Sequence, residues 1–135
     1  HSLYVHHSIN SPYAFNRKET KDHGDKGNFV GCEVKGNALI VDDVVSSGAS
    51  ISESIELLKK KNSICNDVLV AFDRMEIGKT KSASCELETV HSVNMHHLID
   101  LDDIYDYIKS NSKYKKYIQS MDEYMNNYKA SKKEV

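Results

Sequence analysis

The sequence predicts an α/β fold in which a mainly parallel sheet is flanked by helices, and three segments carry this prediction. Residues 38–45, ALIVDDVV, are an aliphatic and β-branched run interrupted only by two aspartates, which is typical of a buried parallel strand. Residues 51–61 follow with apolar side chains at helical spacing, and residues 67–72, DVLVAF, are again strand-like. Strand, turn, helix and strand in this order indicate a βαβ unit.

Further features are predicted within this unit and after it. Ser50 and Glu53 fit a capping box at the start of the first helix. Residues 90–96 suit another strand, and residues 100–108 suit a helix with one apolar face. A last helix is expected over residues 114–128, where a stripe of aromatic, Ile and Met side chains suits docking better than ligand binding.

Length and composition favour one soluble domain over residues 1–135. The net charge of −2 lacks the basic excess of a nucleic-acid binder, and no apolar stretch approaches the roughly 20 residues that span a bilayer. The three cysteines are an odd number at wide spacing, which fits neither a disulfide framework nor a zinc site. We therefore expect a cytoplasmic protein without a nucleic-acid or membrane partner.

Residues 17–31, RKETKDHGDKGNFVG, are polar and charged and contain three of the six glycines, so they read as a mobile loop. Arg17, Lys18, Lys21 and His23 concentrate positive charge there with few apolar anchors. Such a loop suits a lid that closes over an anionic group and excludes water. The alternative to a functional lid is a charged loop that is simply solvated.

Asp42 and Asp43 lie near the end of a predicted buried strand, where carboxylates are costly unless hydroxyls, a metal or other donors meet them. One explanation involves no function: the two carboxylates would simply accept hydrogen bonds from nearby backbone N–H groups. In open α/β sheets, however, ligands bind beyond the carboxyl ends of the strands. We therefore interpret the pair as part of a ligand site.

The turn Ser46–Ser50 follows the acidic pair and leads into a helix. Exposed N–H groups and the positive end of the helix dipole can surround an anion there, and the serine hydroxyls add donors. Gly48 permits a close approach of the backbone. Carboxylates beside a phosphate site predict a sugar phosphate as ligand.

Two motifs resemble a known family. VDDVVSSGAS is similar to the PRPP-binding signature of type I phosphoribosyltransferases, and PYAFNRKETKDHGDKGNFVG resembles the mobile catalytic loop of the orotate phosphoribosyltransferases. The resemblance extends from Tyr13 to about Tyr128. It implies a Rossmann-like type I phosphoribosyltransferase core and an enzyme, a pentosyltransferase of the glycosyltransferase class. That enzyme transfers the phosphoribosyl group of PRPP to orotate, giving orotidine 5′-monophosphate and pyrophosphate in de novo UMP biosynthesis.

The resemblance also implies roles for individual residues. The catalytic residues would be Lys21, Arg17, His23 and Asp43. PRPP would be bound by Arg17, Lys18, Lys21, His23, Asp42, Asp43, Val44, Val45, Ser46, Ser47, Gly48, Ala49 and Ser50. Orotate would contact Ser46 and Arg74, and an Asp73–Arg74 surface pair is the structural alternative for that arginine. Mg²⁺ would arrive bound to PRPP rather than directly to the protein, and the loop would reach the neighbouring subunit of a homodimer.

The sequence departs from the family pattern in two respects. The family normally has a substantial segment before the loop, so the resemblance implies that the N-terminal part of the core is missing and that this chain alone lacks part of its active site. Ala49 stands where many members have threonine, which removes one possible phosphate donor, whereas Ser46 keeps a hydroxyl.

Two other functions remain as alternatives. A PRPP-sensing regulator of the same fold would keep the turn and perform no transfer, but the retained RKETKDHG loop favours catalysis. A receiver-like phosphoacceptor domain also has paired acids after a strand, but it would need a later aspartate and lysine that Asp73 and Lys79 supply poorly.

Overall fold

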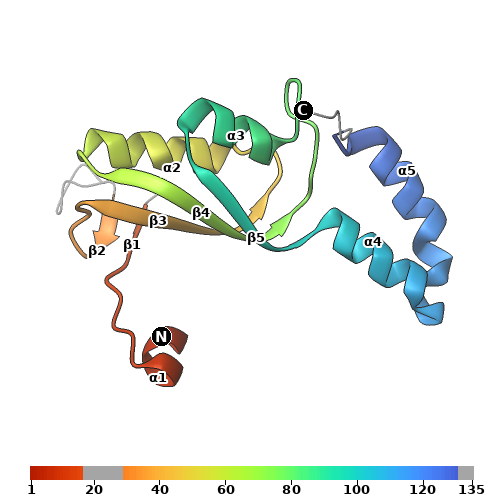
Figure 1. Ribbon diagram of the computed structural model, residues 1–135, viewed down its shortest axis with the longest axis horizontal. Coiled ribbons are helices and arrows are strands. Elements are labelled where there is room, and N and C mark those ends of the chain that lie inside the picture. The colour runs from red at the N-terminus through yellow and green to blue at the C-terminus, as the bar shows by residue number, and fades with distance from the viewer. Residues whose placement is uncertain (17–28, 131–135) are drawn as a thin grey trace.

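The protein is described by a computed structural model that covers residues 1–16 and 29–130 (Figure 1). Its centre is a parallel sheet of β3 (Asn37–Val45), β4 (Ile64–Asp73) and β5 (Asn94–Asp100), in the order β3-β4-β5. Ile40 is paired with Val68, and Val68 in turn with Met95. The predicted α/β class, the parallel sheet and the βαβ unit are confirmed.

One face of the sheet is covered by two helices, α2 (Ala49–Lys60) and α3 (Ala83–His91), which lie on the same side of it (Figure 1). The core lies between these helices and the sheet, and Ile51, Ile55, Val68 and Val70 are each no more than 2% exposed. Burying one such side chain contributes roughly 1.5–3 kcal/mol. The apolar spacing of residues 51–58 therefore predicts the buried face of α2 correctly.

The other face of the sheet is largely uncovered by the described residues. Leu39, Val41 and Leu98 are 56%, 68% and 71% exposed there. Parallel sheets are normally covered on both faces. The expectation of a buried strand at residues 38–45 therefore holds for one face only, because the described residues pack against one side of β3.

Two local predictions are wrong. Gly48 is the N-cap of α2 and no side chain caps this helix, so the expected Ser50–Glu53 capping box does not form. Residues 90 and 91 belong to α3 rather than to a strand, and β5 begins only at Asn94. The sequence does not predict helix α3, because only Ala83 and Leu87 are buried in it and two positions are too few for a clear helical period.

The chain continues through α4 (Leu101–Ser110), the 3₁₀ helix η1 (Ser112–Tyr117) and α5 (Ile118–Tyr128), which extend away from the sheet (Figure 1). These elements confirm the two expected C-terminal helices, although the second begins as a 3₁₀ turn. The end of α5 returns to the segment after β4, where Ile77 N–H donates to Tyr128 O at 2.8 Å and Ala130 N–H to Met75 O at 2.9 Å. No helix in residues 1–16 or 29–130 is long and apolar enough to cross a membrane.

The N-terminal region contains α1 (Ser2–His7) and an antiparallel pair, β1 (Ala14–Asn16) with β2 (Phe29–Gly31). The pair brackets residues 17–28, so the predicted loop residues Arg17, Lys18, Lys21 and His23 lie outside the described residues. Phe29–Gly31, which the sequence assigns to the loop, form a strand. Gly31 has φ 118°, and a Cβ there would lie 2.4 Å from Tyr13 O, so this crossing requires glycine.

Glu86 organises the loop between β4 and α3. Its Oε1 accepts the backbone N–H groups of Lys79 at 2.6 Å, Thr80 at 2.7 Å and Lys81 at 3.2 Å. Hydrogen bonds from Thr80 and Lys81, followed by that from Lys79, hold the pKa of Glu86 below its ordinary value. These bonds favour the ionised carboxylate in the folded protein.

We expect the Glu86→Gln variant to be less stable than the original protein at neutral pH. A carboxyl whose folded pKa is lowered contributes stability above its unfolded pKa, about 4.3 for glutamate, and loses it as the pH falls through the folded pKa. The difference in melting temperature between the two proteins should therefore be full at pH 7 and vanish in acid. Glu53→Gln is a suitable control, because Glu53 is exposed. Glu88→Gln is not suitable, because Glu88 accepts a hydrogen bond from Met95 N–H. A constant difference from pH 7 to pH 3 would contradict this role.

Candidate active site at the carboxyl edge of the sheet

The carboxyl ends of β3 and β4 bring two distant segments to one edge of the sheet. The turn Ser46–Ser50 follows β3, and Arg74 follows β4 directly. The backbone N–H of Arg74 donates to Val45 O at 3.2 Å. The strand residue just before the predicted phosphate turn is thus joined to the backbone of the predicted base contact, at the edge where ligands bind in open α/β sheets.

The two aspartates of β3 have different surroundings, because consecutive strand residues point to opposite faces. Asp42 is partly buried, and its Oδ2 accepts from Ser50 Oγ at 3.4 Å while its Oδ1 accepts from Asp43 N–H at 2.9 Å. Asp43 is exposed. The contact with Ser50 connects Asp42 to the turn, whereas the side chain of Asp43 lies on the opposite face of the strand.

The turn itself is shaped by Gly48, which has φ 73° and ψ 2° and is buried. Ala49 N–H donates to Ser47 Oγ at 3.5 Å, a long and weak contact, so this N–H can exchange it for a stronger acceptor. The side chain of Val45 is 1% exposed and packs in the core, so of the predicted PRPP contacts this residue can offer only its backbone. The turn thus presents N–H and hydroxyl donors at the start of a 12-residue helix.

We expect Gly48→Ala to destabilise the fold more than Gly36→Ala does. Both glycines have positive φ, 73° and 66°, so both variants carry the cost of a left-handed alanine, about 1–2 kcal/mol. A Cβ at Gly48 would also lie 3.0 Å from Leu87 Cδ1, whereas one at Gly36 meets nothing within 4 Å. Urea unfolding of the two variants measures the difference, and equal losses of stability would contradict tight packing of the turn against α3.

Arg74 lies in a cluster with Tyr124 of α5 and Glu76. Its Nη2 and Nε donate to Tyr124 Oη at 2.7 and 3.1 Å, and Nη2 lies 2.7 Å from Glu76 Oε1. The hydrogen bond to Tyr124, followed by the charge of Glu76, raises the pKa of Arg74. Burial, followed by the hydrogen bond to Glu76, raises the pKa of Tyr124.

The structural alternative for Arg74, a pair with Asp73, is not the arrangement found. Asp73 is 6% exposed, and its carboxylate accepts from Met75 N–H at 2.7 Å instead. The sequence gives no signal for the role of Tyr124, because it is separated from Arg74 by 50 positions and belongs to a stripe that reads as a docking face. Glu76 was also missed, although its distance of two residues from Arg74 makes a pair possible.

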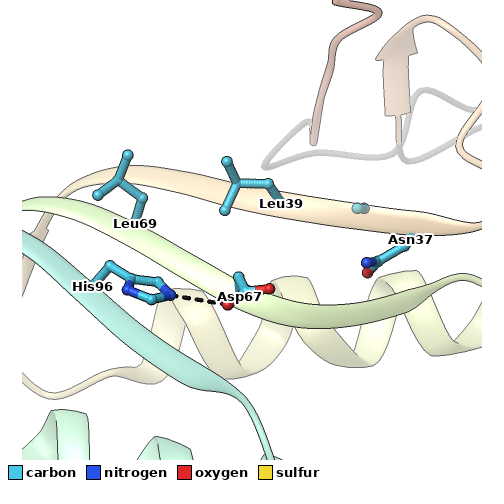
Figure 2. A pocket seen from close by; sticks show the side chains of 6 residues that line it. Asn37, Leu39, Asp67, Leu69 and His96 are labelled. Carbon is cyan, nitrogen blue, oxygen red and sulfur yellow. Dashed lines mark hydrogen bonds and ion pairs between the residues drawn. The ribbon is translucent and has the colours of Figure 1, made fainter.

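A hollow lies on the uncovered face of the sheet (Figure 2). It has a volume of about 410 Å³ and is lined by Asn37, Ala38, Leu39, Asp67, Leu69 and His96. His96 Nε2 and Asp67 Oδ1 are 2.9 Å apart in it, and this hydrogen bond, followed by that from Asn94, lowers the pKa of Asp67. The hollow lies toward the amino ends of β3, β4 and β5, and none of the predicted site residues that the structure describes lines it.

Comparisons with known proteins agree with the predicted family. No protein-family model matches the chain. The chain is 38% identical over 128 residues to an orotate phosphoribosyltransferase of Photorhabdus laumondii, covering 94% of this chain and 60% of that protein. It is 39% identical over 121 residues to the enzyme of the same name from Actinobacillus pleuropneumoniae, covering 89% of this chain and 57% of that protein.

A comparison with solved structures finds the same similarity. The crystal structure of an orotate phosphoribosyltransferase from Francisella tularensis superposes with a TM-score of 0.74 at 27% identity, covering 96% of this chain and 61% of that one. The parallel sheet with its flanking helices is therefore that of type I phosphoribosyltransferases. The chain is thus similar to orotate phosphoribosyltransferases over nearly its whole length, and it spans about 60% of the length of the curated relatives it matches.

Proposed function

We propose that the carboxyl edge of β3 and β4 is the PRPP- and orotate-binding site of an orotate phosphoribosyltransferase. The observation that carries the proposal is the backbone hydrogen bond between Arg74 and Val45, because it brings the predicted base contact beside the predicted phosphate turn. The reaction joins N1 of orotate to C1 of the ribose while the bond from C1 to the pyrophosphate oxygen breaks. The bonding electron pair leaves with pyrophosphate, and the N1 proton of orotate is released.

PRPP would bind with its 5-phosphate in the turn. The N–H groups and hydroxyls of Ser46–Ser50 and the positive end of the α2 dipole are suitable donors for a phosphate. Asp42 and Asp43 would accept hydrogen bonds from the ribose hydroxyls, and the Ser50 hydroxyl would orient Asp42. Val45 would contribute through its backbone, because its side chain is buried in the core, and the neighbouring Val44 would complete this contact.

The leaving group would be stabilised by the loop residues Arg17, Lys18, Lys21 and His23, whose assignment rests on the sequence resemblance. Lys21 is the first choice for the charge that accumulates on pyrophosphate, and His23 would donate a hydrogen bond or a proton. Orotate would place its carboxylate or carbonyl oxygens on the Arg74 guanidinium, with Ser46 as a second contact.

Mg²⁺ would arrive with PRPP, bound to its pyrophosphate and ribose oxygens, and would supply neutralisation of the leaving group's charge. The donor set fits a metal delivered in this way. Asp42 and Asp43 offer carboxylates beside the ribose site, and no group of three His, Cys, Asp or Glu in the described part of the chain is arranged to hold an ion by itself.

The remaining parts of the proposal concern assembly and location. The enzyme would be a cytoplasmic homodimer in which the loop of one subunit reaches the active site of the other. The chain matches about 60% of the length of its curated relatives. Activity is therefore best measured on the protein at its natural length.

The test is a turnover assay with a panel of bases. The natural-length protein is incubated with PRPP and Mg²⁺ and with orotate, uracil, adenine or hypoxanthine, and pyrophosphate release is measured. The proposal predicts release only with orotate, in equal amounts with orotidine 5′-monophosphate. Saturable PRPP binding without product from any base would contradict the proposal and support the PRPP-sensing regulator.

A further inference from the structure

The guanidinium of Arg74 is held on one side and open on the other. Tyr124 Oη accepts from Nε and Nη2 and itself donates to Glu76 Oε1 at 2.5 Å, while Glu76 also pairs with Nη2 at 2.7 Å. Nη1 has no hydrogen-bond partner within residues 1–16 and 29–130. The Arg74 side chain is still 39% exposed, compared with 21% for Glu76. A ligand can therefore reach the Nη1 donors.

The backbone around Arg74 is fixed from two directions. Met75 has φ 51°, and its N–H is bound by the buried Asp73 carboxylate at 2.7 Å, so the turn after β4 has one defined path. The end of α5 is tied to the same turn through hydrogen bonds from Ala130 N–H to Met75 O and from Ile77 N–H to Tyr128 O. Tyr124 thus acts from a helix that is anchored to the segment carrying Arg74.

We propose that Tyr124 and Glu76 are positioning residues that hold Arg74 with its Nη1 donors directed at the carboxylate or carbonyl oxygens of orotate. This inference rests on the proposed function and assigns part of the preference for an acidic base to helix α5. Without the Tyr124 hydroxyl, Nε and Nη2 lose their neutral acceptor. The Arg74 guanidinium can then rotate about its remaining contact with Glu76, so orotate must order it on binding.

The position of Arg74 is testable without activity, because the chain contains only two arginines, Arg17 and Arg74. In a protein labelled with ¹⁵N-arginine, Arg74→Lys identifies the Nε–H signal of Arg74. We expect this proton to exchange slowly with water and to exchange at least about tenfold faster in Tyr124→Phe, because a protein hydrogen bond protects it. Unchanged exchange in a folded Tyr124→Phe protein would overturn the inference.

Tyr128→Phe is the matched control. Tyr128 is on the same helix with its ring centroid 5.1 Å from that of Tyr124, and its hydroxyl has no hydrogen-bond partner in the described part of the chain. This variant removes the same atom from a neighbouring ring, so the Arg74 signal should stay protected. Equal loss of protection in both variants would mean that the helix has loosened generally, which also overturns the inference.

Steady-state kinetics of the natural-length protein give the second readout. We expect Tyr124→Phe to raise the KM for orotate about tenfold, the loss of about 1.4 kcal/mol of binding, with kcat and the KM for PRPP within about twofold of the original values. Tyr128→Phe should change none of the three. An active protein whose orotate KM is unaffected by Tyr124→Phe would refute the positioning role. No turnover by the unmodified protein would instead refute the proposed function, and the exchange experiment would still decide whether Tyr124 positions Arg74.

Discussion

Replacing both Asp42 and Asp43 with asparagine is expected to abolish the stabilisation of the protein by PRPP and Mg²⁺. A ligand at about 100 times its dissociation constant raises the free energy of unfolding by about 2.7 kcal/mol, and the double variant should show almost none of this gain. The physical reason is that the two carboxylates accept hydrogen bonds from the ribose hydroxyls in the proposed complex, whereas an amide also presents donors. Thermal unfolding with and without PRPP measures the effect.

Asp67→Asn is the control for this experiment. Asp67 is also a strand carboxylate with polar partners, but it lies in the hollow on the uncovered face of the sheet. Its loss should leave the response to PRPP intact. Full stabilisation of the Asp42→Asn, Asp43→Asn protein by PRPP would remove the acidic pair from the proposed site.

The second large effect is expected at Lys21, which the family resemblance makes the main stabiliser of the leaving pyrophosphate. Lys21→Ala should lower kcat about 100- to 1000-fold, the cost that typically follows the loss of one preorganised donor to a developing negative charge. The KM values for PRPP and orotate should change much less, because the interaction is strongest in the transition state. Single-turnover measurements on the natural-length protein separate the chemical step from binding.

Lys35→Ala is the matched control for the loss of one lysine near the loop. Lys35 is an exposed lysine beyond β2, and its Nζ lies 2.8 Å from Glu33 Oε2 on the surface. Its replacement should leave kcat within about twofold, since exposed ion pairs contribute little. If Lys21→Ala retained normal kcat, the loop would not stabilise the leaving group through this residue.

The sequence predicts the elements whose patterns are strong. The run 38–45, the apolar spacing from Ile51 to Leu58 and the run 67–72 are each clear, and the structure has β3, α2 and β4 there. The capping box was wrong because Gly48 adopts the left-handed conformation and begins the helix before Ser50, whose hydroxyl bonds to Asp42 instead. A local motif does not reveal which of two partners a hydroxyl will choose.

The candidate site was predictable where its residues are close in the sequence. Asp42, Asp43 and the turn Ser46–Ser50 form one segment, so a single motif contains them. The support of Arg74 by Tyr124 was not predictable, because it depends on how α5 returns to the turn after β4. The uncovered face of the sheet is likewise invisible in the run 38–45, because a strand buried on both faces and one buried on a single face can share that sequence.

The most direct test of the proposed site is to map where PRPP binds. Amide chemical shifts of the natural-length, ¹⁵N-labelled protein are measured while PRPP and Mg²⁺ are added. We predict that the largest changes occur at Asp42, Asp43 and Ser46–Ser50, and that subsequent orotate adds changes at Arg74. The assignment of the carboxyl edge as the active site would be contradicted if PRPP shifted the amide signals of Asn37, Asp67 and His96 in the hollow on the uncovered face and left those of Ser46–Ser50 unchanged.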